Sequence, residues 1–278
     1  MTDSPRQAVP DIRVTSTRNE RVKAARKLSM KKYRQKQGLI LVEGIRTVEM
    51  AATVGLGFDA LFCVAEVLDE YPHLVAMVRS LGGAIIEVTG EIIEAISTLA
   101  SSPGVVGVAA RPVWPRSEVL SRALDGDTSV LVWFDRVSDP SNLGAIIRSA
   151  HCLGADGYLA SPGTVEIFNP RAIRSSAGST FMLPGLENID LAEMTNLLRP
   201  HGFILAATVP RGGVSLDQLQ STKRLVLMIG EEARGLSDDA LEASGLGITI
   251  PMVEEAESLN VAAASAIILH HLSPVAPS

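Results

Sequence analysis

Three stretches of the sequence place polar side chains shortly after an apolar run. They are "DPSNLGAIIRSA" (139–150), "GEEARGLS" (230–237) and "ESLN" (257–260). A guanidinium stays charged at every physiological pH, so an arginine in such a stretch can bind a phosphate or stabilise an oxyanion, but it is no base. Carboxylates and amides can orient that arginine and the group that reacts. The side chains with this chemistry are Asn142, Arg148, Glu231, Glu232, Ser258 and Asn260.

The elements that must position these side chains are predicted by the apolar runs. Runs at 129–135, 156–161, 202–208, 224–230 and 247–252 lack polar alternation, which is typical of parallel strands buried on both faces. Helical patterns lie at 143–153, 190–199, 237–243 and 258–271, with Asn142, Ser237 and Ser258 as predicted N-caps. An open α/β sheet binds ligands beyond the carboxyl ends of its strands, so we expect the three stretches at one edge.

Several classes of protein are disfavoured. The phosphate-binding pattern G-x-x-x-x-G-K-[ST] and the dinucleotide-binding pattern G-x-G-x-x-G are absent, which argues against a nucleotide-binding oxidoreductase. Cys63 and Cys152 cannot build a disulfide framework or a Cys-rich metal site, and we expect both to be buried in a reduced, cytoplasmic protein without a metal. No apolar run approaches the roughly 20 residues that span a bilayer, and the N-terminus lacks a secretory signal.

The N-terminal part of the chain is basic, although the whole chain carries a net charge of −6. Residues 1–46 contain 12 Lys and Arg against four Asp and Glu, a charge of +8, so the remainder carries −14. Such an asymmetry indicates either a polyanionic partner or a solvated helix face. Most of these basic residues lie in a predicted helix over 16–37, whose apolar stripe is Val22, Ala25 and Leu28.

The pattern of elements predicts two domains. We expect a disordered leader (1–12), a small α/β domain (13–112), a linker near Pro112 and Pro115 (113–127) and a larger α/β domain (128–278). The small domain has strand-like runs at 38–44, 59–66, 82–90 and 104–110, with helical patterns at 45–54, 68–82 and 91–100 between them.

Together and in this order, "DRVSDPSNLGAIIRSA", "LMIGEEARGLS" and "ITIPMVEEAESLNVAAASAIILHHL" resemble the three sequence motifs of the SpoU/TrmH family of RNA methyltransferases, in the SPOUT superfamily. "NPRAIRSSAGSTFMLP" (169–184) resembles the stretch that the family carries between the first two motifs, and the resemblance covers most of 128–272. "LILVEGIRTVEMA" and "ISTLASSPGVVGVAA" are similar to two stretches of the substrate-binding domain of many members.

The resemblance implies methylation of a ribose 2′-hydroxyl in structured RNA, with S-adenosylmethionine as the donor. It also implies an open, mostly parallel sheet with a C-terminal trefoil knot, preceded by a smaller α/β substrate-binding domain, and a homodimer. The separate N-terminal domain favours 23S rRNA of the large subunit over tRNA. The alternatives are a tRNA 2′-O-methyltransferase, an enzyme that protects the ribosome from an antibiotic, and a catalytically inactive RNA-binding or ribosome assembly factor of the same fold.

The resemblance also implies roles for particular residues. Arg148 would clamp a phosphate and stabilise the developing alkoxide, within one chain or across the dimer, and Gly230 would let the chain approach a ligand closely. Glu231 stands where a small or amide residue is more usual, which leaves Glu232 as the family's acid. The implied catalytic residues are Asn142, Arg148, Glu232, Ser258 and Asn260, and the implied cofactor-binding residues are Thr208, Gly230, Ile250, Met252 and Leu259.

RNA contacts are expected from the basic N-terminal part and from one arginine of the second domain. Phosphate contacts would give salt-dependent affinity, and a tyrosine among them could stack on a base. Deletion of residues 1–36 is therefore expected to weaken RNA binding and flatten its salt dependence. The expected RNA-binding residues are Arg18, Arg21, Lys23, Arg26, Lys31, Lys32, Tyr33, Arg34 and Arg174.

Overall fold

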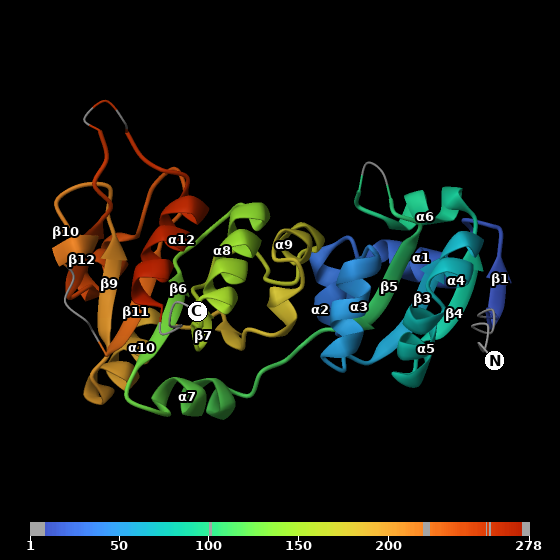
Figure 1. Cartoon of the computed structure of the whole chain (residues 1–278), viewed down its shortest axis with the longest axis horizontal. Helices are drawn as coiled ribbons and strands as arrows, with labels where there is room; N and C mark the ends of the chain where they lie inside the picture. The colour runs from blue at the N-terminus through green and yellow to red at the C-terminus, as the bar shows by residue number, and fades with distance from the viewer. Residues whose placement is uncertain (1–8, 100–101, 219–222, 254, 256, 274–278) are drawn as a thin grey trace, which may run out of the picture. The chain divides into compact units, whose positions relative to one another are not determined.

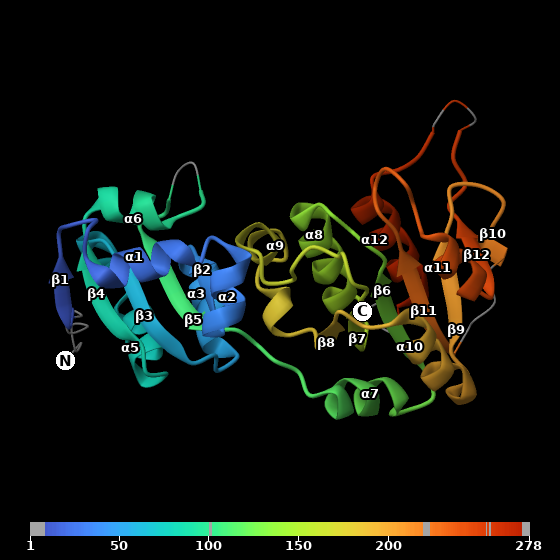
Figure 2. The ribbon, with the colours of Figure 1, turned by 180° about the vertical axis from the view of Figure 1, so that it is seen from behind.

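The computed structural model describes residues 9–99, 102–218, 223–253, 255 and 257–273, which form two α/β units (Figures 1 and 2). Unit 1 runs to Pro112 and also contains Phe168–Phe181, whereas unit 2 contains Val113–Ile167 and the chain from Met182 onward. The position of 168–181 differs from the prediction, which placed this segment in the second domain. Its helix packs on a strand of unit 1, and Phe168 and Phe181 are buried.

Among the described residues of unit 1, the strands form one five-stranded sheet in the order β1-β4-β3-β5-β2. β5 runs antiparallel to β2 and β3, and the other pairs are parallel. α1 and α6 bury apolar side chains against one face, while α3 and α5 pack on the other. The elements are β1 (Ile12–Val14), α1 (Glu20–Lys27), α2 (Lys31–Gln37), β2 (Leu39–Glu43), α3 (Ile45–Thr53), β3 (Phe58–Cys63), α4 (Ala65–Glu70), α5 (Pro72–Ser80), β4 (Ala84–Val88), α6 (Gly90–Ile96), β5 (Val105–Ala110), α9 (Pro170–Ser175) and a 3₁₀ turn (Ser179–Phe181).

The described residues of unit 2 form a seven-stranded sheet in the order β10-β12-β9-β11-β6-β7-β8, and every pair of neighbours is parallel. α7, α10 and α11 pack on one face, whereas α8 and α12 pack against each other on the opposite face (Figure 1). The elements are α7 (Arg116–Leu124), β6 (Ser129–Phe134), α8 (Pro140–Cys152), β7 (Gly157–Ala160), β8 (Gly185–Glu187), α10 (Leu191–Leu198), β9 (Ile204–Thr208), β10 (Val214–Ser215), β11 (Arg224–Ile229), α11 (Asp238–Ala243), β12 (Leu246–Thr249), α12 (Val261–Leu272) and 3₁₀ turns at Arg199–His201 and Leu216–Gln218.

The predicted helix over 16–37 is two helices, α1 and α2, with a break at Leu28–Met30. Leu28 is buried in the core of unit 1, and Met30 has an extended backbone. Nη1 of Arg34 donates to the carbonyl oxygens of Leu28 at 2.7 Å and of Ser29 at 2.8 Å, which satisfies groups that the end of α1 leaves without helical partners. Arg34 is only 1% exposed, so its assignment as an RNA-binding residue is wrong.

The chain around Ile12 is ordered as an edge strand, although residues 1–12 were expected to form a disordered leader. Oδ2 of Asp11 accepts from the backbone N–H of Ile85 at 2.8 Å, and Oδ1 accepts from Arg79 at 3.0 Å. These two contacts hold the pKa of the Asp11 carboxyl below its ordinary value. Residues 1–8 lie outside the described residues.

The expected linker at 113–127 contains helix α7. Val119 and Ala123 lie one turn apart on this helix, and both are fully buried in the core of unit 2. The two prolines therefore precede a packed helix, and the prediction of a linker over this whole segment is wrong.

The two cysteines differ from each other. Burial raises the pKa of the Cys63 thiol to about 12, so this thiol is protonated and inert at neutral pH. Cys152 is exposed at the end of α8, so its expected burial is wrong.

Within the described ranges, no helix is long and apolar enough to cross a membrane, and no group of three His, Cys, Asp or Glu side chains could hold a metal ion.

Candidate active site

The carboxyl ends of four neighbouring strands of unit 2 lie at one edge of the sheet. The last residues of β6 and β11, Phe134 and Ile229, pair with each other. β9 continues the alignment on the other side of β11, and Thr208 at its end pairs with Ile248 of β12. The segments that follow these strands therefore begin side by side, which confirms that the three polar stretches meet at one edge.

Helix α8, which follows β6, has Asp139 as its N-cap. Oδ1 of Asp139 accepts from the backbone N–H of Ser141 at 2.6 Å and of Asn142 at 3.4 Å. The prediction of Asn142 as the N-cap is wrong, because Asp139 stands directly before Pro140, and proline fits the first position of a helix. Asn142 lies in the first turn instead, where its amide can reach other segments.

The side chain of Asn142 connects the segments that follow β6, β11 and β12. Its Nδ2 donates to Oε1 of Glu232 at 2.9 Å, and its Oδ1 accepts from Nδ2 of Asn260 at 3.2 Å. Oε2 of Glu232 accepts from Oγ of Ser138 at 3.4 Å. We call Ser138, Asn142, Glu232 and Asn260 the polar network. The sequence did not indicate Ser138 as a member.

The direction of each hydrogen bond in the polar network follows from the donors available. An ionised carboxylate only accepts, so the NH₂ group of Asn142 faces Glu232 and its carbonyl oxygen faces Asn260. The NH₂ group of Asn260 therefore donates, and its own Oδ1 accepts from the backbone N–H of Ala262 at 2.9 Å and of Ala263 at 3.2 Å. The backbone N–H groups at the start of α12 thus orient the side chain of Asn260. Asn260 in turn orients the amide of Asn142, and that amide is hydrogen-bonded to Glu232.

Asn260 is the N-cap of α12, which begins at Val261. The prediction that Ser258 caps a helix beginning at 258 is wrong, because the asparagine directly precedes the helix and its oxygen reaches two backbone N–H groups. Ser258 is exposed and lines the pocket described below.

The segment after β11 is a tight turn between Glu231 and Gly235. The backbone N–H of each donates to the carbonyl oxygen of the other, at 3.0 Å and 2.8 Å, and Gly235 has a φ of 72°, which favours glycine. A Cβ at Gly230 would overlap the backbone of Gly235 and Leu236. Gly230 was expected to be glycine so that a ligand could approach the chain. The structure gives another reason: the backbone of Gly235 and Leu236 lies too close to Gly230 for a side chain to fit.

Asp135, which the sequence did not single out, anchors this turn to the end of β6. Its side chain is 6% exposed, and its Oδ2 accepts from the backbone N–H of Ser237 at 2.7 Å. Ser237 is the N-cap of α11, as predicted, with its side chain accepting from Ala240. A carboxylate that ends a buried strand was the available signal for this role.

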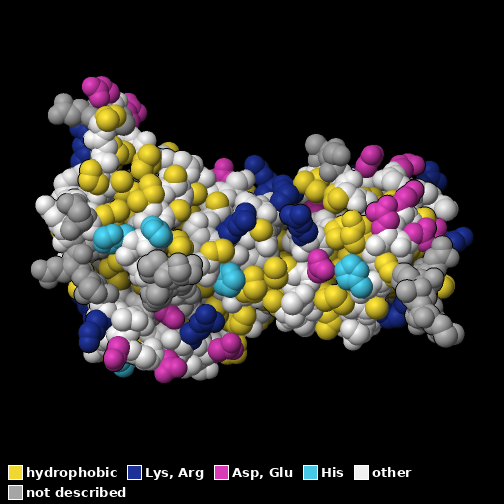
Figure 3. All heavy atoms as spheres, in the orientation of Figure 1, with side chains coloured by type: hydrophobic (Ala, Val, Ile, Leu, Met, Phe, Trp, Pro, Cys, Tyr) yellow, Lys and Arg dark blue, Asp and Glu magenta, His cyan; other side chains and the backbone are white. Residues whose placement is uncertain are grey.

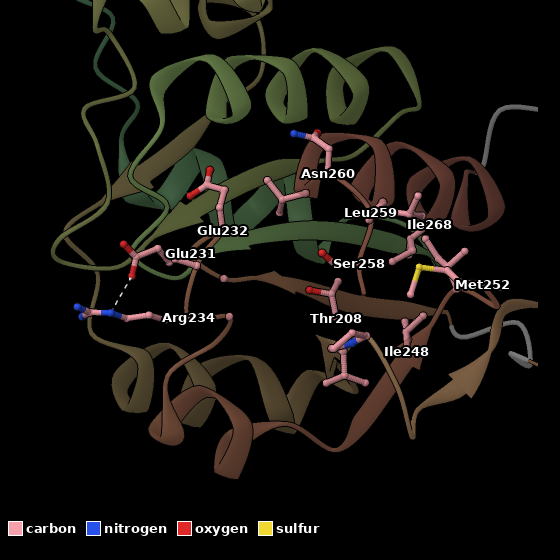
Figure 4. A pocket seen from close by; sticks show the side chains of 18 residues that line it. Thr208, Glu231, Glu232, Arg234, Ile248, Met252, Ser258, Leu259, Asn260 and Ile268 are labelled. Carbon is pink, nitrogen blue, oxygen red and sulfur yellow. Dashed lines mark ion pairs between the residues drawn. The ribbon is translucent and has the colours of Figure 1, made fainter. Parts of the chain in front are cut away.

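A pocket of about 540 Å³ opens among these segments. Figure 4 shows apolar side chains at one end, including Ile248, Met252 and Ile268, and the acids of the turn at the other. Ser258 and Thr208 lie between the two ends. All five residues expected to bind a cofactor line this pocket, together with three of the five expected catalytic residues: Thr208, Gly230, Ile250, Met252 and Leu259, with Glu232, Ser258 and Asn260.

The two acids of the turn point in different directions (Figure 4). Oε2 of Glu231 lies 3.9 Å from Nε of Arg234, whose side chain is 85% exposed. Glu232 alone joins the polar network. The geometry therefore supports Glu232, rather than its neighbour, as the acid of the site.

Arg148 is exposed on α8, as its place outside the apolar stripe of the helix predicts. Within the described part of the chain it makes no hydrogen bond or ion pair, and it does not line the pocket. It lies six residues after Asn142, which corresponds to a rotation of about 240° around the helix axis. Within the described residues of one chain, no hydrogen bond joins Arg148 to Asn142.

Eight of the nine expected RNA-binding residues lie on α1 and α2 or just before α1, and the ninth, Arg174, lies on α9. The Tyr33 ring is half-buried, with Nζ of Lys27 5.7 Å and Nζ of Lys32 4.9 Å from its centroid. Arg174, on α9, is half-buried. Of the expected RNA-binding residues, Lys23 pairs with Glu20 at 2.8 Å, and the exposed basic ones are Arg18, Arg21, Lys23, Arg26, Lys31 and Lys32.

Comparison with known families gives two matches along the chain. A sequence model of the SpoU rRNA methylase family matches residues 129–270. A model of the MRM3-like substrate binding domain matches residues 19–107.

Curated relatives match over nearly the whole chain. An uncharacterized tRNA/rRNA methyltransferase of Synechocystis sp. is 30% identical over 92% of this chain and 92% of its own length. The 23S rRNA (guanosine(2553)-2′-O)-methyltransferase of Bacillus subtilis is 29% identical over 93% of this chain and 98% of its own. The 23S rRNA (uridine(2479)-2′-O)-methyltransferase of Streptomyces viridochromogenes is 29% identical, with coverages of 91% and 94%.

Solved structures with the same fold include two with a bound cofactor. An AdoMet-bound rRNA methyltransferase from Sinorhizobium meliloti has a TM-score of 0.81 and 28% identity, covering 94% of this chain and 97% of that chain. The SpoU methyltransferase AviRb from Streptomyces viridochromogenes in complex with AdoMet has a TM-score of 0.80 and 27% identity, with coverages of 92% and 97%.

Proposed function

This chain belongs to the SpoU rRNA methylase family, and we propose that it transfers a methyl group from S-adenosylmethionine to a ribose 2′-hydroxyl of 23S rRNA. The observation that carries the proposal is the polar network of Ser138, Asn142, Glu232 and Asn260 beside the pocket. The choice of large-subunit rRNA rests on two relatives whose names give 23S rRNA 2′-O-methylation.

S-adenosylmethionine fits the pocket in size and in polarity. A volume of about 540 Å³ is within the range of pockets for small ligands. Ile250, Met252 and Leu259 would enclose its apolar faces, while Thr208 and the turn after Gly230 would meet its polar groups. Two similar structures hold AdoMet. When bound, the cofactor supplies an electrophilic methyl group.

The side chains of this chain would orient the ribose and stabilise the charge that develops on its oxygen. The polar network holds three segments in one arrangement before RNA binds, so little freedom is lost when the substrate arrives. The guanidinium of Arg148 would bind the phosphate next to the reacting ribose and stabilise the oxygen as the hydroxyl loses its proton. Ser258 would contact the nucleotide from the pocket side.

A homodimer would complete the site, with Arg148 of one chain beside the pocket of the other. Support comes from the orientation of Arg148, which is exposed and on a different side of α8 from Asn142. Figure 3 shows hydrophobic side chains gathered on unit 2 over α12 and the segment before it, and Val253, Leu259 and Ile267 are exposed there. An apolar surface of this kind suits a subunit interface.

The proposal extends to the trefoil knot and to the cell compartment. The knot is supported by the position of β11 between β9 and β6, and by the turn after β11, which lines the pocket together with Ile250, Met252 and 258–260. A cytoplasmic location follows from an rRNA substrate.

Arg148→Ala tests the role of the guanidinium. We expect the kcat of methyl transfer to fall at least about 100-fold, because a preorganised charge at the developing oxyanion is lost. The Kd of the cofactor should change less than about twofold, because Arg148 lies outside the pocket. Transfer of a tritiated methyl group to 23S rRNA and tRNA transcripts measures the rate, and primer extension sensitive to 2′-O-methylation maps the product.

Arg148→Lys is the control for this test, and three other results would contradict parts of the proposal. Arg148→Lys keeps the charge and loses the planar fork, so it should retain part of the activity. Loss of cofactor binding in Arg148→Ala would contradict the assigned role. Methylation of tRNA but not of 23S rRNA would contradict the substrate, and no transfer by the unaltered chain would contradict the activity.

A further inference from the structure

Unit 1 contains a second pocket, of about 180 Å³, between α1 and the sheet. Its floor is apolar: Leu28, Phe62 and Val108 line it, and each is at most 3% exposed. Ala24 of α1 stands at its edge and is exposed. The volume is about that of six water molecules in the liquid, which suits a single planar ring system rather than a whole nucleotide.

Three polar side chains surround this apolar floor: Arg21, Gln37 and Asp59. All three are exposed, and within the described residues none of these side chains makes a hydrogen bond or ion pair. Together they offer donors from a guanidinium, a donor and an acceptor from an amide, and two acceptors from a carboxylate. An apolar slot with a free polar rim matches a ligand with flat faces and hydrogen-bonding edges.

The pocket lies beside the exposed basic side chains of α1 and α2. Arg18 and Arg26 are exposed on or next to α1, and Lys31 and Lys32 are exposed at the start of α2. Such charges attract a phosphate backbone without regard to sequence, whereas bases are recognised by stacking and by contacts to their edges. Glu20 on α1 and Glu91 and Glu94 on α6 are also exposed, but Asp59 is the acid that lines the pocket, and a carboxylate there would repel a phosphate.

We propose that this pocket takes one unstacked base of the RNA substrate, with Asp59 accepting a hydrogen bond from its amino or imino edge. This inference rests on the proposed function, since it takes RNA as the substrate. Leu28, Phe62 and Val108 pack on the face of the base, and Arg21 and Gln37 contact its edge or its sugar-phosphate. Contacts in the pocket would make RNA binding depend on the base, whereas the other contacts of this surface are electrostatic and independent of sequence.

Filling the pocket is the first test. Ala24→Leu, in the full chain, is expected to weaken binding of an unmodified 23S rRNA transcript about tenfold, the size of one lost base contact. Because Ala24→Leu removes no charged side chain, the slope of log Kd against log salt between about 50 and 200 mM should change by less than one phosphate contact would give. Lys31→Ala with Lys32→Ala should instead flatten that slope. Ala76→Leu, an exposed alanine on α5 across the sheet, is the matched control and should bind as the unaltered chain does.

Asp59→Leu, which removes both the charge and the hydrogen-bond acceptor at similar shape, separates base recognition from plain charge. If Asp59 were only an acid near the RNA, its neutralisation would strengthen binding, because a repulsion is removed. If it accepts from a base, the same variant weakens binding. We expect weaker binding at every salt concentration.

The outcomes distinguish this inference from the proposed function. Unchanged RNA affinity in Ala24→Leu, or tighter binding by Asp59→Leu, overturns the base pocket. Methyl transfer by the unaltered chain to the same transcript is measured in parallel, and its absence overturns the function while binding still tests the pocket. Thermal unfolding confirms that the variants fold.

Discussion

Asn142 is the side chain on which the geometry of the site depends, since it is hydrogen-bonded to both Glu232 and Asn260. The sequence predicted all three residues, because each lies shortly after an apolar run. It did not predict that they bond to one another, because the pairs lie 90 and 118 positions apart. Only the alignment of strand ends brings them together.

Asn142→Asp tests the directed hydrogen bonds of the polar network. Two carboxylates at the 2.9 Å separation seen for Asn142 and Glu232 repel when both are ionised, so the variant should be inactive at pH 8. As the pH falls, one of them takes up a proton and can donate again, so activity should partly return. The measurement is the pH profile of methyl transfer for both proteins.

A control variant measures the effect of one added negative charge elsewhere on the same unit. Asn196→Asp introduces the same change on the exposed side of α10 and should leave the profile of the unaltered chain unchanged. An Asn142→Asp profile parallel to that of the unaltered chain would argue against the network.

The elements of the site were predicted by type and place, but the starts of α8 and α12 were not. In both helices the cap is the residue directly before the first helical position: Asp139 rather than Asn142 in α8, and Asn260 rather than Ser258 in α12. Helix α7 was missed because two prolines precede it, although Val119 and Ala123 have helical spacing. Local patterns identify an element, while tertiary packing sets its ends.

The link between β6 and α11 through Asp135 is expected to hold the turn after β11. Asp135→Ala leaves the part-buried N–H of Ser237 without its partner, so the free energy of unfolding should fall by about 1–2 kcal/mol. Because the turn lines the pocket, the Kd of S-adenosylmethionine should rise as well. Urea unfolding and calorimetric titration measure the two effects.

Asp190→Ala provides the comparison. Asp190 also accepts from a helix N–H, that of Glu193 at 2.8 Å, but it is exposed at the start of α10. Its loss should cost about 1 kcal/mol of stability and leave the cofactor Kd unchanged. An equal loss of cofactor affinity in both variants would show that Asp135 acts only through global stability.

At the scale of the whole molecule, the assembly that completes the site can be tested by mixing. Arg148→Ala and Asn142→Ala are each expected to be inactive. If Arg148 serves the other chain of a homodimer, reassociated mixtures contain dimers with one intact site, and random pairing restores about a quarter of the full activity. Activity that stays at the level of the separate variants would place Arg148 and Asn142 in the same site of one chain.

The division into two units is only partly visible in the sequence. Strand and helix patterns indicated two α/β regions, but no local signal indicates that 168–181 clusters with residues far before it. The basic charge of residues 1–46 was visible at once, yet the burial of Arg34 was not, because its role is to cap carbonyls that a break in the helix exposes. The composition of a segment gives its net charge, but it does not show which of the charged side chains are exposed.

Helix α1 is basic on its surface and yet part of the core, since Val22, Ala25 and Leu28 are buried. Deleting residues 1–36 would therefore unfold unit 1 rather than isolate its charges. Because α1 is part of the core, the backbone that carries its arginines is already folded before RNA binds. Association then orders side chains but folds no backbone here, so the heat-capacity change should reflect contact area alone, without the larger signature of coupled folding.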